Sequence, residues 1–263
     1  MKAIALKFKE ILAYRNMIAG LVKRDLRGRY KGSMLGFLWN FVNPLCQMIV
    51  YTIVFSTVFP NDIEKYYVFI MVGMMPWNFF SDSLMQGSGS IVHQAEMTKK
   101  IYFPREVLPM SIVISRLVNL LLTFLIMFVV IMVSGIGISL SSLVWLPLIL
   151  LVEFIMALGF SLLLSAINVY FRDVEYMTGV VLMAWIWMTP IMYSFDAIFS
   201  PWMKWVVGKN PMTPIILAYQ NVLYYHKAPD MVSLSHSLIF ALIVFVLGEI
   251  VFNKLERNFA EQL

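Results

Sequence analysis

Long apolar stretches alternate with short polar ones along most of the chain. Stretches of roughly 20 residues recur, which is the length a helix needs to cross a hydrocarbon core of about 30 Å. The pattern predicts six membrane-spanning helices, at residues 35–59, 66–86, 107–133, 143–167, 176–195 and 233–253. The second is the least regular, because Pro76, Ser81 and Asp82 interrupt it. The predicted fold class is therefore an all-α integral membrane protein with six transmembrane helices.

The composition agrees with a membrane location. Hydrophobic residues make up 60% of the chain and charged residues 13%, with a mean hydropathy of +0.80, whereas soluble domains are about 45–50% apolar. The net charge of +5 does not indicate nucleic-acid binding, because the charges lie between the apolar stretches and near their ends. Cys46, the only cysteine, lies inside the first predicted span and cannot form an intramolecular disulfide.

The distribution of Lys and Arg predicts the orientation. If the N-terminus is cytoplasmic, 16 of the 20 basic residues fall in the inner segments. The outer segments then hold Lys65, Lys204, Lys209 and Lys227. Because the inner loops of membrane proteins carry the excess of Lys and Arg, both termini are predicted to be cytoplasmic.

Residues 1–33 form a predicted segment of their own. Apolar residues recur at helical spacing and basic residues lie mostly on the other face. The apolar positions are Ile4, Phe8, Ile11, Leu12, Ile18, Leu21 and Val22. The pattern predicts an amphipathic helix in the cytoplasmic interface of the membrane, either attached to anionic lipid or docked on a partner protein. Residues 34–263 are predicted to form the transmembrane domain.

The segment 87–106 is the longest predicted inner loop. Glycine and serine residues end the second span, residues 91–97 can form two helical turns, and Pro104 stops them. A solvated connector and a docking segment both fit this pattern. His93 has no second histidine near it in the sequence, so it is expected to be a surface polar residue rather than a ligand.

The outer segment 196–232 contains two predicted short helices. Ser200-Pro201 is typical of a helix start and Gly208 of a helix end. Thr213-Pro214 opens a second helix, which is too apolar to be solvated and too short to cross a membrane. This second helix is predicted to be re-entrant or interfacial.

Several kinds of chemistry have no signal in the sequence. The chain has no G-x-x-x-x-G-K-[ST] phosphate loop, and it lacks the H-E-x-x-H, C-x-x-C and G-x-S-x-G motifs of common enzymes. Glu153 is the one ionisable residue near the middle of a span, and it could contact a neighbouring helix or line a transport pathway. Asp82, Arg116 and Glu249 lie nearer the ends and are expected to reach water.

Five motifs in a fixed order resemble one protein family. They are Y-K-G-S-x-L-G-x-L-W at 30–39, F-P-R at 103–105, N-V-Y-F-R-D at 168–173, T-P-I-x-Y at 189–193 and N-P at 210–211. Together they resemble the permease subunit of ABC transporters that export O-antigen, capsule or teichoic acid. The resemblance covers nearly the whole chain.

The resemblance implies a homodimer that forms one channel in the bacterial cytoplasmic (inner) membrane. It implies two copies of a separate ABC ATPase, which bind ATP and magnesium, and no cofactor bound by this chain. The implied cargo is a lipid-linked polysaccharide, with O-antigen favoured over capsule or teichoic acid. The alternatives are a permease for a drug, a haem-like cofactor or a lipid, an ion-coupled carrier that depends on Glu153, and a membrane enzyme.

Aromatic side chains are the candidate substrate contacts. Sugar rings expose C–H faces rimmed by hydroxyl groups, and such faces suit flat rings with polar edges. The first and fifth helices line the pathway in the family that the chain resembles. The candidates on these helices are Trp39, Tyr51, Phe55, Trp185, Trp187 and Tyr193.

The resemblance also implies roles for the two polar loops. The inner loop corresponds to the family's coupling helix, and its candidate ATPase contacts are Ile91, His93, Glu96, Lys99, Lys100 and Arg105. The short outer helices correspond to an outer gate, with candidates Trp202, Trp205, Pro214 and Tyr219. For Trp202 and Trp205, anchoring at the membrane interface is the favoured alternative.

Overall fold

The computed structural model describes residues 13–28, 32–58 and 63–262, and within these ranges the chain is helical without any strand. The helices are α2 (Arg15–Gly28), α3 (Trp39–Val58), α4 (Tyr66–Gly89), α5 (Ala95–Lys100), α6 (Val107–Ser134), α7 (Leu140–Leu143), α8 (Leu146–Tyr170), α9 (Asp173–Trp185), α10 (Pro201–Lys209), α11 (Thr213–Leu223), α12 (Met231–Leu255) and α13 (Phe259–Gln262). The prediction of an all-α protein is confirmed for the described residues.

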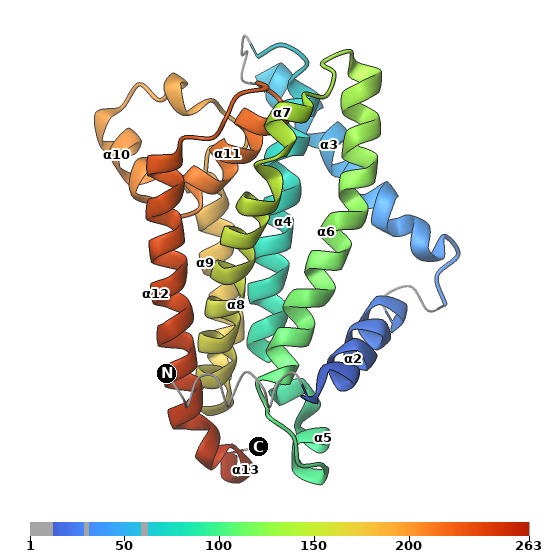
Figure 1. Ribbon diagram of the computed structural model, residues 1–263, viewed down its shortest axis with the longest axis vertical. Helices are drawn as coiled ribbons and strands as arrows, with labels where there is room; N and C mark the ends of the chain where they lie inside the picture. Colours follow the sequence, from blue (N-terminus) through green and yellow to red (C-terminus); the bar gives the residue numbers. More distant parts are fainter. Residues whose placement is uncertain (1–12, 29–31, 59–62, 263) are drawn as a thin grey trace.

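Four long helices, α4, α6, α8 and α12, run side by side along the long axis of the molecule (Figure 1). α4 packs against α6, α8, α9 and α11, so it lies at the centre of the bundle. α3 packs against α4 and α6, and its lower end leans away from the bundle in Figure 1. α7, α10 and α11 lie at the upper end in that view, and α2, α5 and α13 lie toward the lower end.

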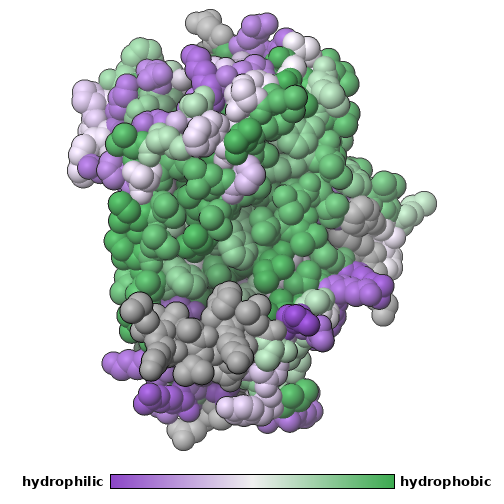
Figure 2. Space-filling view, viewed as in Figure 1, coloured by the Kyte–Doolittle hydropathy of each residue, from purple (hydrophilic) through white to green (hydrophobic). Residues whose placement is uncertain are grey.

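The surface of the bundle is apolar around its middle and polar at both ends (Figure 2). Among the described residues, three helical stretches are long and apolar enough to cross a membrane: Val107–Ser134, Leu140–Tyr170 and Met231–Asn258. The exposed side chains of α12 include Ile243 and Ile250. An apolar surface of this extent is typical of a protein that lies in a bilayer.

The closest helix pair is α8 with α12, and two glycines explain it. A Cβ atom added at Gly248 would lie 2.5 Å from the carbonyl oxygen of Gly159. One added at Gly159 would lie 2.6 Å from the backbone nitrogen of Phe245. Small residues let two apolar helices approach until their backbones touch, so this pair forms a tightly packed frame.

Each of the six predicted spans contains a helix, and the fifth is shorter than predicted. α9 ends at Trp185 and continues only as a 3-10 helix over Ile186–Met188, whereas the predicted span ran to residue 195. Thr189 is extended (φ −118°, ψ 131°), because a proline at position 190 disfavours helical backbone in the residue before it. In contrast, α4 continues unbroken through Pro76.

The predicted amphipathic segment 1–33 is described only in part. Residues 1–12 and 29–31, which include Tyr30 and Lys31 of the first motif, lie outside the described residues. Within the remainder, α2 forms a helix that packs against α6 and buries Leu21.

Candidate functional site

A buried ion pair attaches α2 to the bundle. The Arg116 side chain on α6 is 1% exposed, and its Nη2 atom lies 2.9 Å from the Oδ2 atom of Asp25 on α2. Ser115 also donates a hydrogen bond to Asp25, and Arg116 donates to Gln86 on α4. The sequence-based prediction that Arg116 reaches water is therefore wrong. Asp25 packs over the Arg116 side chain and supplies its counter-charge.

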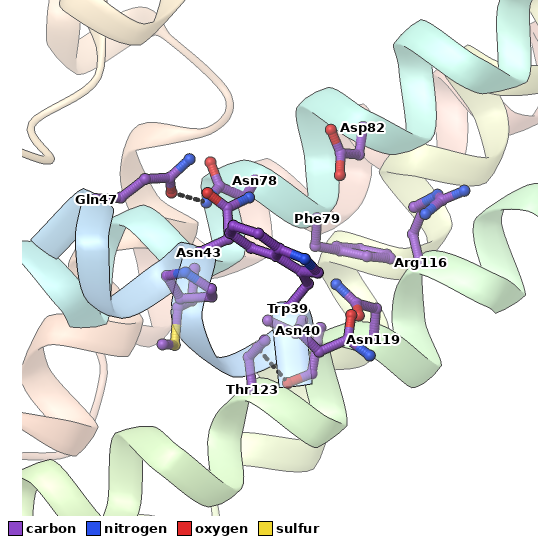
Figure 3. Close-up of a pocket in the computed structure, with 13 residues that line it drawn as sticks. Trp39, Asn40, Asn43, Gln47, Asn78, Phe79, Asp82, Arg116, Asn119 and Thr123 are labelled. Atoms are coloured by element: carbon purple, nitrogen blue, oxygen red, sulfur yellow. Dashed lines mark hydrogen bonds between the residues drawn. The ribbon is translucent and has the colours of Figure 1, made fainter. Parts of the chain in front are cut away.

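Next to Arg116, a cavity of about 160 Å³ lies between α3, α4 and α6 (Figure 3). We call it the polar pocket. Its lining residues are Trp39, Asn40, Asn43, Pro44, Gln47, Met75, Asn78, Phe79, Asp82, Arg116, Asn119, Leu120 and Thr123. The Nδ2 atom of Asn78 donates to Oε1 of Gln47 over 2.8 Å, which links α4 to α3. Trp39 reaches from α3 into the space between these helices.

Of the residues that line this pocket, Trp39 was predicted as a pathway aromatic and Asp82 and Arg116 were noted as ionisable residues in spans, whereas the uncharged polar residues were not predicted. A signal for them exists, since Asn40, Asn43 and Gln47 are spaced i, i+3 and i+7 and so share one face of α3. On α6, Arg116, Asn119 and Thr123 repeat the same spacing. The faces of both helices meet at the polar pocket.

At the upper end of the molecule in Figure 1, a larger cavity of about 1130 Å³ is rich in aromatic side chains. We call it the outer aromatic pocket. The rings and charged or titratable groups that line it are Phe55, Glu64, Lys65, Tyr66, Trp187, Tyr193, Phe199, Tyr224, Tyr225 and His226. Burial raises the pKa of Tyr224 and Tyr225 above the usual range, so both stay neutral hydroxyl groups near the pocket.

Three of the six predicted pathway aromatics lie together in the outer aromatic pocket. Phe55 and Trp187 pack with ring centroids 6.2 Å apart, and Tyr193 donates to the carbonyl oxygen of Trp187 over 2.9 Å. Tyr51 packs against Phe55 just below them, with centroids 6.3 Å apart. The rings come from α3 and from the segment that follows α9, which correspond to the first and fifth predicted spans.

Trp185 lies elsewhere, in an aromatic cluster inside the bundle. Its ring packs against Trp77, Phe80 and Phe160 at centroid distances of 6.4, 5.4 and 5.9 Å. Its Nε1 atom donates to Oδ1 of Asn210 over 2.8 Å. Both the ring and the polar edge of Trp185 are thus engaged within this chain.

The four predicted gate residues divide into exposed and buried pairs. Trp202 and Trp205 on α10 are 71% and 63% exposed, which suits an interfacial anchor. Pro214 lies in the first turn of α11. A proline is tolerated there because backbone N–H groups of the first turn have no acceptor within the helix. Tyr219 on α11 is fully buried.

Glu153 on α8 is buried against α11. Tyr219 donates a hydrogen bond to its Oε2 atom over 2.7 Å, and Oε1 has no hydrogen-bond partner in the described part of the chain. Glu153 lines neither the polar pocket nor the outer aromatic pocket. Of the two roles the sequence left open, the structure thus favours contact with a neighbouring helix.

The predicted coupling residues form two groups on the inner loop. Glu96, Lys99 and Lys100 are exposed on α5, and Lys100 pairs with Glu96 at 3.2 Å. Ile91, which precedes α5, is fully buried. The loop thus combines exposed charged residues on α5 with a buried apolar residue ahead of it.

His93 and Arg105 connect the inner loop to other helices. The Nε2 atom of His93 lies 3.4 Å from Oε2 of Glu175 in the first turn of α9. Arg105 donates from Nη1 to the carbonyl oxygen of Glu256 over 2.6 Å, and its guanidinium group lies 5.7 Å from the ring centroid of Phe259. A displacement of the loop would therefore act directly on α9 and on the short segment that follows α12.

Comparison with known proteins gives the class to which this arrangement belongs. The sequence model of the ABC-2 type transporter family matches residues 17–224, which is most of the chain. The chain belongs to the ABC-2 type transporter family, whose members are membrane subunits of transporters. This confirms the family predicted from the five motifs.

Curated relatives narrow the likeness further. The chain is 32% identical over 256 residues to the O-antigen export system permease protein RfbA of Myxococcus xanthus, covering 97% of this chain and 98% of the relative. It is 33% identical over 261 residues to a protein of the same name from Klebsiella pneumoniae, covering 99% and 100%. The polysialic acid transport protein KpsM of Escherichia coli is 19% identical over 237 residues.

Proposed function

We propose that this chain is the channel-forming permease of an ATP-driven exporter that moves a lipid-linked polysaccharide, in the first place O-antigen, across the bacterial inner membrane. The observation that carries the proposal is the outer aromatic pocket, in which rings from α3 and from the segment after α9 surround a cavity of about 1130 Å³. Flat rings with polar edges accept successive sugar units without binding any one of them tightly. The near full-length similarity to two O-antigen export permeases supports the same cargo.

In this proposal six helices span the membrane with both termini in the cytoplasm. The spans are α3, α4, α6, α8, α9 with the 3-10 turn at Ile186–Met188, and α12. The charge distribution of the sequence supports this orientation, and the apolar band in Figure 2 supports the depth of insertion. The upper end in Figure 1 then faces outward, where α11 is re-entrant and α10 lies in the interface.

Energy comes from a separate subunit in this account. The sequence contains no phosphate loop, so two ABC ATPase subunits bind ATP and magnesium and drive a homodimer of this chain. Their docking surface is α5 with its charged face of Glu96, Lys99 and Lys100. No nucleic acid takes part.

The contacts of the inner loop give a route from the ATPase to the cargo. His93 contacts Glu175 at the start of α9, and a 3-10 turn after α9 carries Trp187 into the outer aromatic pocket. A push on the loop therefore moves one wall of that pocket. The exposed rings of Trp202 and Trp205 anchor α10 in the interface, and Tyr219 holds α11 to α8 while the wall moves.

The docking step can be tested by reversing the charges on α5. The variant Glu96→Lys/Lys99→Glu/Lys100→Glu is expected to insert and fold, because all three side chains are exposed, but to lose its ATPase partner and all export. Co-purification of the ATPase and the rate of ATP hydrolysis are the measurements, with Lys204→Glu on α10 as the matched control. Normal stimulation of ATP hydrolysis by the triple variant would contradict the proposed docking surface.

A further inference from the structure

The polar pocket gathers polar side chains from three helices that are otherwise apolar. α3 contributes Asn40, Asn43 and Gln47, and α6 contributes Asn119 beside Arg116. All of them converge on one cavity (Figure 3). Polar side chains in membrane helices are costly and face a cavity or a partner when they are kept.

Several buried polar atoms at this pocket lack a partner. Nε and Nη1 of Arg116 and Oδ1 of Asn119 are inaccessible and make no hydrogen bond within the described part of the chain. Arg116 as a whole is 1% exposed. Buried polar atoms of proteins are almost always satisfied, so these three point to a polar occupant of the cavity.

The charges around the pocket argue against an anionic occupant. Asp25 neutralises Arg116 at 2.9 Å, and Asp82 adds a further carboxylate to the lining. Arg116 is the one basic residue among the described lining residues, so a phosphate or diphosphate group would find no free positive charge there. Within the described residues, no cluster of His, Cys, Asp and Glu could hold a metal ion that would reverse this balance.

The donors and acceptors suit a sugar. A carboxamide offers donor and acceptor atoms at once, which matches the hydroxyl groups of a sugar ring, and Trp39 and Phe79 add flat apolar faces. The cavity of about 160 Å³ is close to the ~150 Å³ that takes up one six-membered ring in an engineered case. It is too small for an oligosaccharide.

The position of the pocket along the helices fits the start of a transport path. Gln47 is eight residues into α3, which begins at Trp39, so the α3 part of the pocket covers roughly the first 12 Å of that helix. This is the end of α3 that the proposed orientation places on the cytoplasmic side.

We propose that the polar pocket binds a single neutral sugar ring of the lipid-linked glycan in the inner half of the membrane. The carboxamides of Asn43, Asn78 and Asn119 hydrogen-bond to its hydroxyl groups while Trp39 covers one face. This proposal rests on the proposed function. It adds a site that selects the sugar on the cytoplasmic side, before the glycan reaches the outer aromatic pocket, which binds successive sugar units without selecting among them.

The lone cysteine makes a direct binding test possible. In a Cys46→Ser background, Pro44→Cys places one thiol at a half-buried position of the pocket lining that is not one of the proposed sugar contacts, and Ser235→Cys places a control thiol on the exposed surface of α12. The protein in lipid nanodiscs is labelled with a small maleimide, with and without octyl glycosides of glucose, galactose, mannose and N-acetylglucosamine below their micelle concentrations. Octyl phosphocholine serves as the sugar-free amphiphile.

At least one glycoside is expected to slow labelling of Pro44→Cys saturably, by about threefold at twice its dissociation constant, and to leave Ser235→Cys unchanged. Equal protection by octyl phosphocholine would show that only the alkyl chain binds, and would overturn the proposal. Protection by none of the four glycosides would overturn it too.

A second variant separates this inference from the proposed function. Asn119→Leu removes one proposed hydrogen bond to the sugar, and loss of one such contact is expected to lower export about tenfold. The ATPase partner should still co-purify with this variant. If wild-type protein exports and Asn119→Leu exports equally well, the pocket is not a sugar site although the proposed function stands. If the wild type binds no ATPase, the proposed function itself fails.

Discussion

α12 meets α8 along backbones that touch at Gly159 and Gly248, whereas α3 meets α4 and α6 across side chains that leave a cavity. The first interface has no space for another molecule. α3, in contrast, lines the polar pocket through Asn43 and the outer aromatic pocket through Phe55. On the proposed function, this difference corresponds to a division of labour in which α8 and α12 form a fixed frame and α3 is the helix proposed to contact cargo.

The strongest test of the frame is Gly248→Leu. Its side chain would have to displace the Gly159 carbonyl oxygen, which lies 2.5 Å from the position of the first added atom, so we expect a loss of about 3 kcal/mol in unfolding free energy. Thermal unfolding in detergent measures the change. Leu247→Ala, at the adjacent exposed position, is the control, and an unchanged melting temperature for Gly248→Leu would break the comparison.

The next largest effect is expected for Arg116→Leu, beside the polar pocket. The variant removes the guanidinium group that pairs with Asp25, and because Asp25 is partly exposed we expect a loss of about 2 kcal/mol, below the usual range for a fully buried pair. Release of α2 should appear as faster proteolysis near its ends. The double variant Asp25→Leu/Arg116→Leu should regain part of the stability; a simple sum of the two single losses would contradict the pairing.

On α3, Phe55→Ala is expected to affect export rather than stability. Loss of its ring contact with Trp187 removes part of the outer aromatic pocket, and we expect export to fall about tenfold, equivalent to about 1.4 kcal/mol. Phe240→Ala on α12 is the matched control and should export normally. Equal effects of the two substitutions would erase the distinction between frame and cargo helix.

The smallest expected effect concerns the N-terminus of α12. Hydrogen bonds from Ser233 and from the backbone of Val232 lower the pKa of Asp230 below its ordinary value. The cap therefore contributes fully above the unfolded-state pKa, and its contribution is lost as pH falls through the lower folded-state pKa. Asp230→Ala should lose about 1 kcal/mol at neutral pH, and the difference from wild type in thermal unfolding should shrink under acidic conditions.

The sequence predicted the helices well because apolar stretches of membrane length are a local signal. It failed at the end of α9, where Pro190 stops the helix although the following residues stay apolar. It also failed for Arg116, since the position of a charge along a helix does not show which neighbour will cover it. Asp25 is far from Arg116 in sequence, and only the packing of α2 on α6 pairs them.

The residues of the two pockets were predicted only in part, because a sequence does not show which neighbour a side chain will face. Phe55, Trp187 and Tyr193, three of the rings predicted to line the pathway, lie in one pocket; their contact with cargo stays a prediction. Trp185 has the same residue type and nearly the same position as Trp187, yet it faces the bundle interior. The polar pocket was missed because each helix carries only two or three of its polar residues.

The most direct test of the central claim is transport by the purified complex. The chain is reconstituted in proteoliposomes with and without its ABC ATPase, and lipid-linked polysaccharide that reaches the opposite face is measured by the access of a glycosidase. We expect delivery only when the ATPase and hydrolysable ATP are both present, and slower delivery with Phe55→Ala. Delivery by the chain alone, driven by an ion gradient and abolished by Glu153→Gln, would contradict it.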